Sequence, residues 1–85
     1  IRIAPHDCTG PIGLTAGAHL SIADKNALIQ ETVRAAYRTW YPFVASGLPT
    51  IASGQLRLSD RPGLGVALNE VFIEEAMSLG TDALK

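Results

Sequence analysis

The residues best suited to acid–base chemistry in this sequence are His6 and Glu31, because each one directly follows a short apolar run. Residues 1–4 precede Pro5 and His6, and residues 27–30 precede Glu31. A histidine titrates near neutral pH, and neighbouring groups tune the ionisation of a carboxylate. Such a pair can move a proton and stabilise a developing oxyanion. Either residue alone is more often structural or solvated, so the hypothesis depends on the two lying together.

The elements around this pair predict that they do lie together. Residues 1–4 and 27–30 are predicted as short buried strands, and residues 12–23 as the helix between them. The apolar residues of the middle segment alternate as in a strand, but its length, together with Gly13 and Gly17, favours a helix packed closely on a sheet. A strand, a helix and a strand within about thirty residues form a βαβ unit with parallel strands. His6 and Glu31 would then follow the carboxyl ends of neighbouring strands, roughly 4.8 Å apart.

The middle of the chain shows a helical apolar stripe that is interrupted by Pro42. We predict a helix that ends near Trp40 or begins again at Pro42, with Gly47 as its C-terminal stop. The stripe has offsets of 0, 3, 4, 7, 8 and 11 and consists of Val33, Ala36, Tyr37, Trp40, Tyr41 and Val44.

The last third of the chain predicts a hairpin and a helix. Residues 49–58 have the pattern of two short strands with a turn at Ser53 and Gly54. Asn69 is predicted to cap a final helix that runs through Met77 and stops at Gly80.

Other chemically capable residues are predicted to have structural roles. Asp7 is a poor orienter of His6, because adjacent residues of an extended chain point to opposite sides, so we expect it to be solvated or to cap the following helix. Cys8 is expected to be a small, partly buried loop residue, and His19 to have a surface or packing role. The aromatic residues are expected to pack, and the sequence contains no set of three or four metal ligands at a diagnostic spacing.

The composition excludes several classes of protein. The chain has 85 residues, of which 47% are hydrophobic and 18% charged, with a formal net charge of −1. This apolar content argues against a disordered segment, and the charge offers no basic stripe for nucleic acid. A single cysteine excludes an internal disulfide framework, and no apolar run approaches the ~18 residues of a membrane span.

A unit with only two parallel strands would leave both outer strand edges bare. Nothing after Glu31 resembles another crossover that ends in a buried strand. We therefore expect the missing strands to lie upstream of Ile1, and the chain to be part of a larger protein.

Four motifs of the sequence form a recognisable set, namely Ala4-Pro5-His6, Gly10-Pro11-Ile12, residues 26–31, and Pro62-Gly63-Leu64-Gly65-Val66. They resemble the C-terminal part of the enolase superfamily. More narrowly, they resemble the mandelate racemase/muconate-lactonizing group and, within it, the acid-sugar dehydratases related to galactonate and mannonate dehydratase. Glu31 follows His6 by 25 positions, as in those dehydratases.

This resemblance implies an α/β fold, namely a fragment of a modified TIM barrel with an α+β capping domain. Residues 1–48 would form the C-terminal portion of the barrel domain, with its last two strands and the intervening helix. Residues 49–85 would return to the capping domain.

The resemblance also implies the chemistry. His6, at the end of the seventh barrel strand, would be the general acid/base, and Glu31, at the end of the eighth, would hydrogen-bond the substrate carboxylate as it becomes an enediolate. Mg²⁺ would be held by acidic residues outside this chain. The intact enzyme would abstract the proton α to a carboxylate and dehydrate a sugar acid; alternatives are a racemase or epimerase, or an inactive fragment that serves only for packing or binding.

The partners implied are a sugar-acid substrate and the remainder of the barrel and capping domain. The intact protein is expected to be a cytoplasmic homo-oligomer, with neither nucleic acid nor membrane as a partner.

Overall fold

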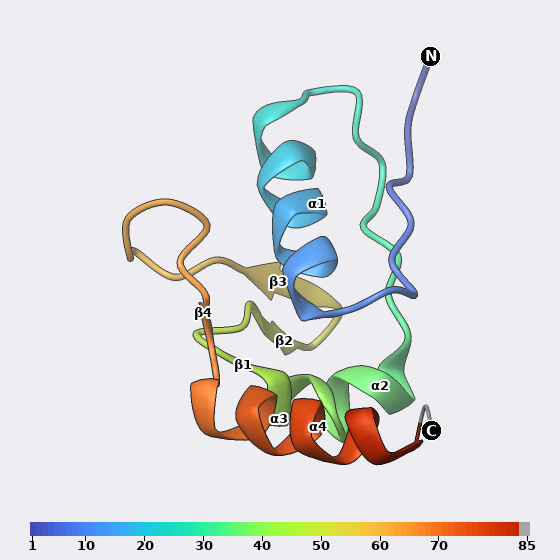
Figure 1. Cartoon of the computed structure of the whole chain (residues 1–85). Coiled ribbons are helices and arrows are strands. Elements are labelled where there is room, and N and C mark those ends of the chain that lie inside the picture. Colours follow the sequence, from blue (N-terminus) through green and yellow to red (C-terminus); the bar gives the residue numbers. More distant parts are fainter. Residues whose placement is uncertain (84–85) are drawn as a thin grey trace.

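Helices carry most of the regular structure in residues 1–83, which are the residues that the computed structural model describes (Figure 1). Two short antiparallel strand pairs complete it. The elements in chain order are α1 (Pro11–Ala23), α2 (Arg34–Arg38), α3 (Tyr41–Val44), β1 (Ala45–Ser46), β2 (Thr50–Ala52), β3 (Gln55–Arg57), β4 (Ala67–Leu68) and α4 (Glu70–Ala83).

The segments before and after α1 run side by side in the same direction (Figure 1). The N–H of Ile3 donates to the carbonyl of Asn26 at 2.9 Å, and the N–H of Leu28 donates to the carbonyl of Ile3 at 2.7 Å. Ile3 and Ala27 form a single parallel bridge. The predicted parallel pairing and the helix between the two segments are therefore confirmed.

The prediction of two buried strands over residues 1–4 and 27–30 is wrong in extent and in burial. The pairing stays at one bridge, and Leu28 and Ile29 are each 58% exposed. Among residues 1–83 no further strand pairs with either segment, so the parallel pairing does not extend into a larger sheet.

The helix α1 begins with Pro11 at its first turn, where the missing N–H costs no hydrogen bond. Leu14 and Ala18 point into the core. A Cβ atom on Gly17 would lie 3.1 Å from the Oε1 atom of Gln30, so this glycine allows the side chain of Gln30 to rest against the helix.

The apolar stripe forms two short helices, as the proline predicts. The helix α2 ends at Arg38 and α3 begins at Tyr41, with Pro42 in its first turn. The Tyr41 ring is fully buried and packs edge-on against Trp40, with ring centroids 4.6 Å apart.

Gly47 is not the helix stop that the sequence predicts, because α3 ends at Val44 and β1 follows it directly. Its φ of 78° lies in the left-handed region, and a Cβ atom there would collide with the carbonyl oxygen of Gly65. Gly47 therefore permits a close approach between two backbone segments.

The predicted hairpin is confirmed. The strands β2 and β3 pair antiparallel, with Ile51 opposite Leu56. Ser53 and Gly54, with φ of 52° and 74°, form the two-residue turn, and positive φ at both positions matches the twist of a tight hairpin. The pairing of β1 with β4 was not predicted, because two-residue strands carry no periodic signal.

The final helix, α4, is capped as predicted and extends further than predicted. The N–H of Phe72 donates to Oδ1 of Asn69 at 3.4 Å, but the helix continues through Gly80 to Ala83. A glycine inside a helix costs only about 1 kcal/mol relative to alanine, so it need not end one.

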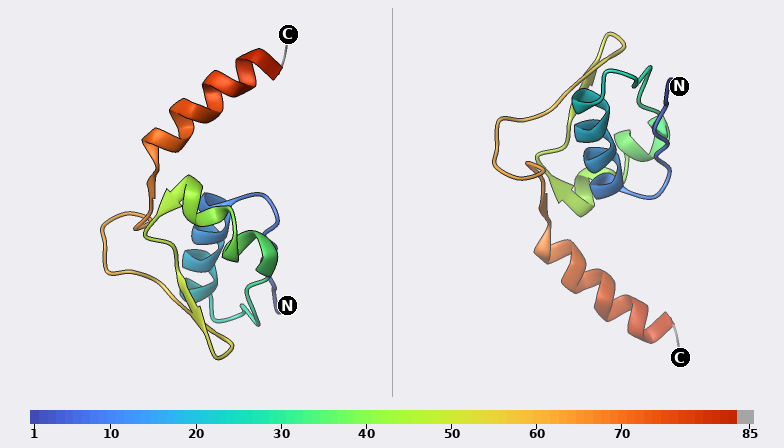
Figure 2. Two further views of the ribbon diagram at one scale, coloured as in Figure 1. Left: turned by 90° about the horizontal axis from the view of Figure 1, so that it is seen from below. Right: turned by 90° about the horizontal axis from the view of Figure 1, so that it is seen from above.

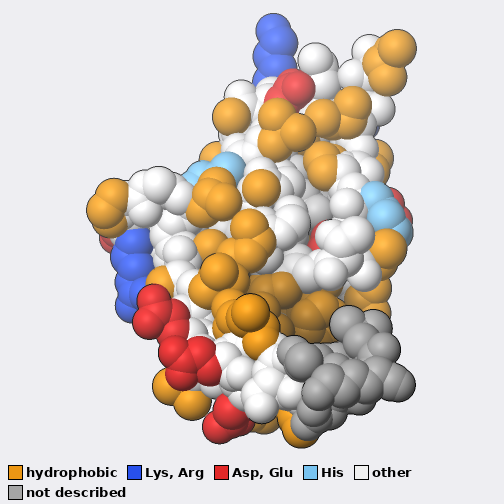
Figure 3. All heavy atoms as spheres, viewed as in Figure 1, with side chains coloured by type: hydrophobic (Ala, Val, Ile, Leu, Met, Phe, Trp, Pro, Cys, Tyr) orange, Lys and Arg blue, Asp and Glu red, His pale blue; other side chains and the backbone are white. Residues whose placement is uncertain are grey.

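Apolar side chains remain widely exposed on this fold. The helix α4 projects away from the other elements (Figure 2), and Val71, Met77 and Leu79 on it are exposed. Hydrophobic side chains gather over the middle of one face of the molecule, with most charged side chains toward its edges (Figure 3). Among residues 1–83, no helix combines the length and the apolar character that crossing a bilayer requires.

Candidate functional site

The structure brings His6 and Glu31 together. The Nδ1 atom of His6 lies 3.5 Å from Oε1 of Glu31, and the two side chains are 65% and 50% exposed. The N–H of Glu31 donates to the carbonyl of Pro5 at 2.9 Å, which fixes the register of the two segment ends. Two groups that can each hold a proton thus face one another in the open, at the carboxyl ends of the paired segments.

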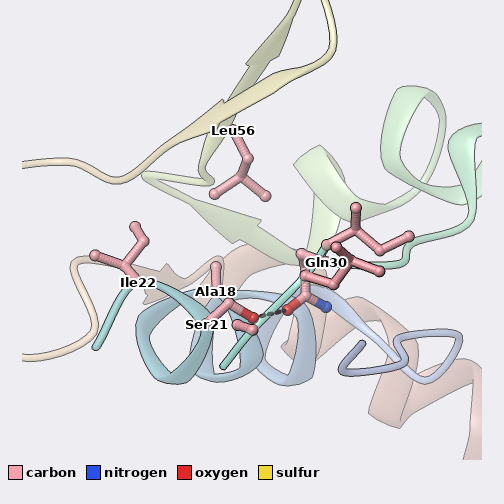
Figure 4. A pocket seen from close by; sticks show the side chains of 8 residues that line it. Ala18, Ser21, Ile22, Gln30 and Leu56 are labelled. Carbon is pink, nitrogen blue, oxygen red and sulfur yellow. Dashed lines mark hydrogen bonds between the residues drawn. The ribbon is translucent and has the colours of Figure 1, made fainter. Parts of the chain in front are cut away.

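The side chain of Gln30 ties this region to α1. Its Nε2 atom donates to the carbonyls of Pro5 and Glu31 at 3.2 and 2.9 Å. Its Oε1 atom accepts from the hydroxyl of Ser21 at 2.9 Å (Figure 4). These bonds hold both segment ends against the helix.

A hollow of about 200 Å³ lies between α1, the segment after it and β3 (Figure 4). Its lining is mostly apolar and includes neither His6 nor Glu31, so these two side chains lie outside it. The labelled lining residues are Ala18, Ser21, Ile22, Gln30 and Leu56.

Asp7 has a more prominent place in the structure than the solvated or capping role expected from the sequence. The expectation that it caps the following helix is wrong: α1 has no side-chain cap, and the Oδ1 atom of Asp7 accepts from the N–H groups of Thr9 and Gly10, at 3.2 and 3.4 Å, in the loop before the helix. Solvation is wrong, because Asp7 is only 2% exposed. Its Oδ2 atom accepts from the hydroxyls of Thr32 and Tyr41 at 2.8 and 2.9 Å.

This burial has a clear physical reason. A buried carboxylate is costly unless its oxygens are hydrogen-bonded, and both oxygens of Asp7 are. The two hydroxyls come from residues 25 and 34 positions away. A donor so distant in the sequence gives no local signal, which is why spacing alone did not reveal the site.

The carboxylate of Asp7 also affects the ionisation of the Tyr41 phenol. Burial of the phenol, the hydrogen bond to Asp7 and the charges of Asp7 and Cys8 raise the pKa of Tyr41 to about 12. Each effect disfavours the phenolate, so the folded protein holds the hydroxyl in its neutral, donating form.

We expect the stability that Tyr41 contributes to depend on alkaline pH. Its folded pKa is above the unfolded value of 10.0, so this contribution is complete below pH 10 and is lost as pH rises to about 12. The check is denaturant unfolding, across that window, of a folded full-length protein that contains these residues and of its Tyr41→Phe variant. The parent should lose its advantage over the variant as pH rises; a constant difference would contradict the buried phenol.

The other predicted residues have mixed outcomes. Nε2 of His19 lies 2.9 Å from the carbonyl oxygen of Leu64, so His19 links α1 to the loop at residues 62–66, and its structural role is confirmed. Cys8 is exposed, which corrects the expectation of partial burial. Gly65, with φ of 81°, closes a turn in which its N–H donates to the carbonyl of Pro62.

The donor set of this chain does not fit a magnesium ion. Among residues 1–83, no three His, Cys, Asp or Glu side chains gather as a metal site would require. No residue of the described part of the chain is therefore assigned as a metal ligand.

Two parallel segments flank the helix α1, with His6 and Glu31 at their carboxyl ends, and together they form an α/β arrangement. The sequence profile of the family described as Enolase C-terminal domain-like matches residues 1–72, and the chain belongs to this family. The resemblance to the enolase superfamily is thus confirmed.

Relatives of this chain include a member of the D-galactonate dehydratase family and a D-gluconate/D-galactonate dehydratase. A D-galactonate dehydratase family member from Musicola paradisiaca is 36% identical over 67 residues, which are 76% of this chain and 15% of the relative. The D-gluconate/D-galactonate dehydratase of Picrophilus torridus is 30% identical over 80 residues, or 94% of this chain and 20% of the relative.

Solved structures agree with this assignment. An enolase of the mandelate racemase subgroup from Agrobacterium tumefaciens is 40% identical with a TM-score of 0.79, covering 88% of this chain and 20% of that one. The chain therefore spans about a fifth or less of the length of these relatives. Its α/β fold matches part of the C-terminal domain of the superfamily; the assignment to the last two barrel strands, and the division at residues 48 and 49, stay predictions.

Proposed function

We propose that this chain supplies the acid–base pair of a longer sugar-acid dehydratase. Residues 1–48 would complete its barrel, and residues 49–85 would return to a capping domain. The observation that carries the proposal is the separation of 3.5 Å between His6 and Glu31 at the carboxyl ends of the paired segments. The similarity to a D-galactonate dehydratase family member and to a D-gluconate/D-galactonate dehydratase supports it. The natural polypeptide that contains these residues and the rest of the barrel is called the complete protein below.

In this proposal His6 removes the proton on the carbon next to the substrate carboxylate. That proton is weakly acidic, and its removal leaves an enediolate whose negative charge needs hydrogen-bond donors. Glu31, whose Oε1 atom lies 3.5 Å from Nδ1 of His6, would act as the carboxylic acid and donate a hydrogen bond to the substrate carboxylate oxygen as this charge develops. Mg²⁺, bound by residues elsewhere in the complete protein, would supply further charge neutralisation.

Dehydration then completes the reaction. The electron pair left on the α carbon forms a carbon–carbon double bond, and the β-hydroxyl leaves as water with a proton from a general acid. With an α-hydroxy acid as substrate, the product is an enol that rearranges to a 2-oxo acid. An epimerase would instead return a proton to the other face of the α carbon.

Exposed apolar side chains support the larger assembly. Leu28 and Ile29 on the second segment are more than half exposed, and they lie three and two positions before Glu31 in the sequence. We propose that the remainder of the barrel covers them, and that the complete protein is a homo-oligomer.

The test is an assay of the complete protein with Mg²⁺ and a panel of sugar acids in deuterium oxide. Formation of a 2-oxo acid supports the dehydratase. Exchange of the α proton with inverted configuration and without 2-oxo acid would favour the epimerase. With neither reaction on any panel member, the proposal fails.

Glu31→Gln in the complete protein should lower kcat by about tenfold, because the amide still donates a hydrogen bond to the enediolate but a weaker one. Glu31→Ala, which removes the donor, should lower kcat by about 10²-fold. Steady-state kinetics measure both. Glu70→Gln is the matched control on exposed α4 and should change nothing; equal activity of Glu31→Ala and the parent would remove Glu31 from the mechanism.

A further inference from the structure

The carboxylate of Asp7 joins parts of the chain that flank the acid–base pair. Its neighbour in sequence is His6, and one of its donors, Thr32, is the neighbour of Glu31. Its other donors are the backbone at the entrance to α1 and Tyr41 at the start of α3. These four hydrogen bonds hold the side chain of Asp7, which is only 2% exposed, in one orientation.

The two members of each neighbouring pair face opposite ways. His6 is exposed while Asp7 is buried, and Glu31 is exposed while Thr32 is half-buried. The hydroxyl of Thr32 donates a hydrogen bond to Asp7 at 2.8 Å. On the exposed side, Nδ1 of His6 lies 3.5 Å from Oε1 of Glu31. The Asp7–Thr32 hydrogen bond therefore connects the two segments at the residues that directly follow His6 and Glu31.

We propose that Asp7 is a positioning residue, which acts through Thr32 to hold His6 and Glu31 at their working separation. The inference rests on the proposed function of that pair. Asp7 touches neither the substrate nor the reacting atoms, and in this role it is distinct from a partner that orients the imidazole by a direct hydrogen bond.

The backbone alone holds the segment ends loosely. Among residues 1–83, the hydrogen bond from Glu31 to the carbonyl of Pro5 is the only main-chain bond between them at this end, and the side chain of Gln30 adds bonds to the carbonyls of Pro5 and Glu31. The Asp7–Thr32 bond is charge-assisted, and such bonds are about twice as strong as neutral ones. A misplacement of about 1 Å between reacting groups can cost about 10²-fold in rate. Loss of the Asp7–Thr32 hydrogen bond should therefore have a large effect on turnover.

The pair Thr32→Val and Thr32→Ser gives the sharpest test in the complete protein. Valine has nearly the shape of threonine but cannot donate to Asp7, whereas serine retains the hydroxyl. Thr32→Val should lower kcat by about ten- to a hundredfold with little change in KM, and Thr32→Ser should restore most of it. Parent-like kcat in Thr32→Val, or no recovery in Thr32→Ser, would overturn the inference.

A purely structural role predicts a different pattern. Tyr41→Phe also removes one hydrogen bond from Asp7, but on the side of α3 rather than of Glu31. It should lower Tm while leaving kcat much closer to the parent than Thr32→Val does. If kcat follows Tm through both variants, Asp7 serves only stability and the inference is wrong.

Asp7→Ala is the direct variant, and Asp24→Ala is its matched control. Asp24 also accepts a backbone hydrogen bond, from Asn26 at 2.8 Å, but it lies at the opposite end of α1. Asp7→Ala should lose about 10²-fold in kcat, and Asp24→Ala should lose little. Where Asp7→Ala does not fold by circular dichroism, the Thr32 pair decides.

Failure of this inference can be separated from failure of the proposed function. If His6→Asn retains turnover, the proposed function is wrong, and a crystal structure of Thr32→Val then decides the positioning role. A separation of His6 and Glu31 beyond about 4 Å supports it, and an unchanged separation overturns it. If His6→Asn is inactive, the kinetics of the Thr32 pair decide.

Discussion

Replacing His6 with asparagine is expected to lower kcat of the complete protein by about 10²–10⁴-fold, the contribution of one positioned general base. Asparagine keeps much of the size of histidine and one N–H donor, but it cannot carry a proton near neutral pH. The loss should appear in kcat far more than in KM, because substrate contacts are retained. Steady-state kinetics at pH 7–8, with α-proton exchange as a second readout, measure it.

The chain offers a matched control in its only other histidine. His19 bonds the carbonyl of Leu64 and lies on α1, away from the pair, so His19→Asn should leave kcat near the parent value. Near-parental kcat in His6→Asn would show that His6 is not the acid/base. Equal loss in both variants would point to a general effect on the fold instead.

The elements that could be predicted from the sequence are those with strong local signals. The turn at Ser53 and Gly54 sets the hairpin, Asn69 sets the start of α4, and Pro42 divides the helical stripe. Each of these effects operates within a few residues. The meeting of His6 and Glu31 was also predictable, because parallel segments on either side of one helix must place their ends together.

What could not be predicted depends on contacts distant in sequence. The burial of Asp7 requires hydroxyls from Thr32 and Tyr41, and the conformation of Gly47 requires the backbone of Gly65. Neither pairing leaves a periodic pattern. The strands over residues 1–4 and 27–30 were overpredicted for a related reason: their apolar composition fits a buried sheet, while the described residues contain one parallel bridge.

The 85 residues alone are expected not to fold cooperatively. The buried apolar core of the described residues consists of Leu14, Ala18, Tyr41 and Ala45, two of which are alanines. Large apolar side chains on both paired segments and on α4 stay exposed, so little hydrophobic free energy offsets the conformational entropy of ordering the chain. Exposed edges of the single parallel bridge add unpaired backbone groups that a larger sheet would satisfy.

Circular dichroism and calorimetry of the isolated chain test this expectation. The far-ultraviolet signal should change gradually with temperature, without a sigmoidal transition, and the chain should bind a hydrophobic dye at low temperature. The complete protein, as the control, should melt cooperatively, because its remaining strands would cover the apolar residues on either side of the acid–base pair. A sharp transition of the isolated chain, with a calorimetric enthalpy near the ~0.7 kcal/mol per residue of globular domains, would contradict the proposal that the rest of a barrel completes this fold.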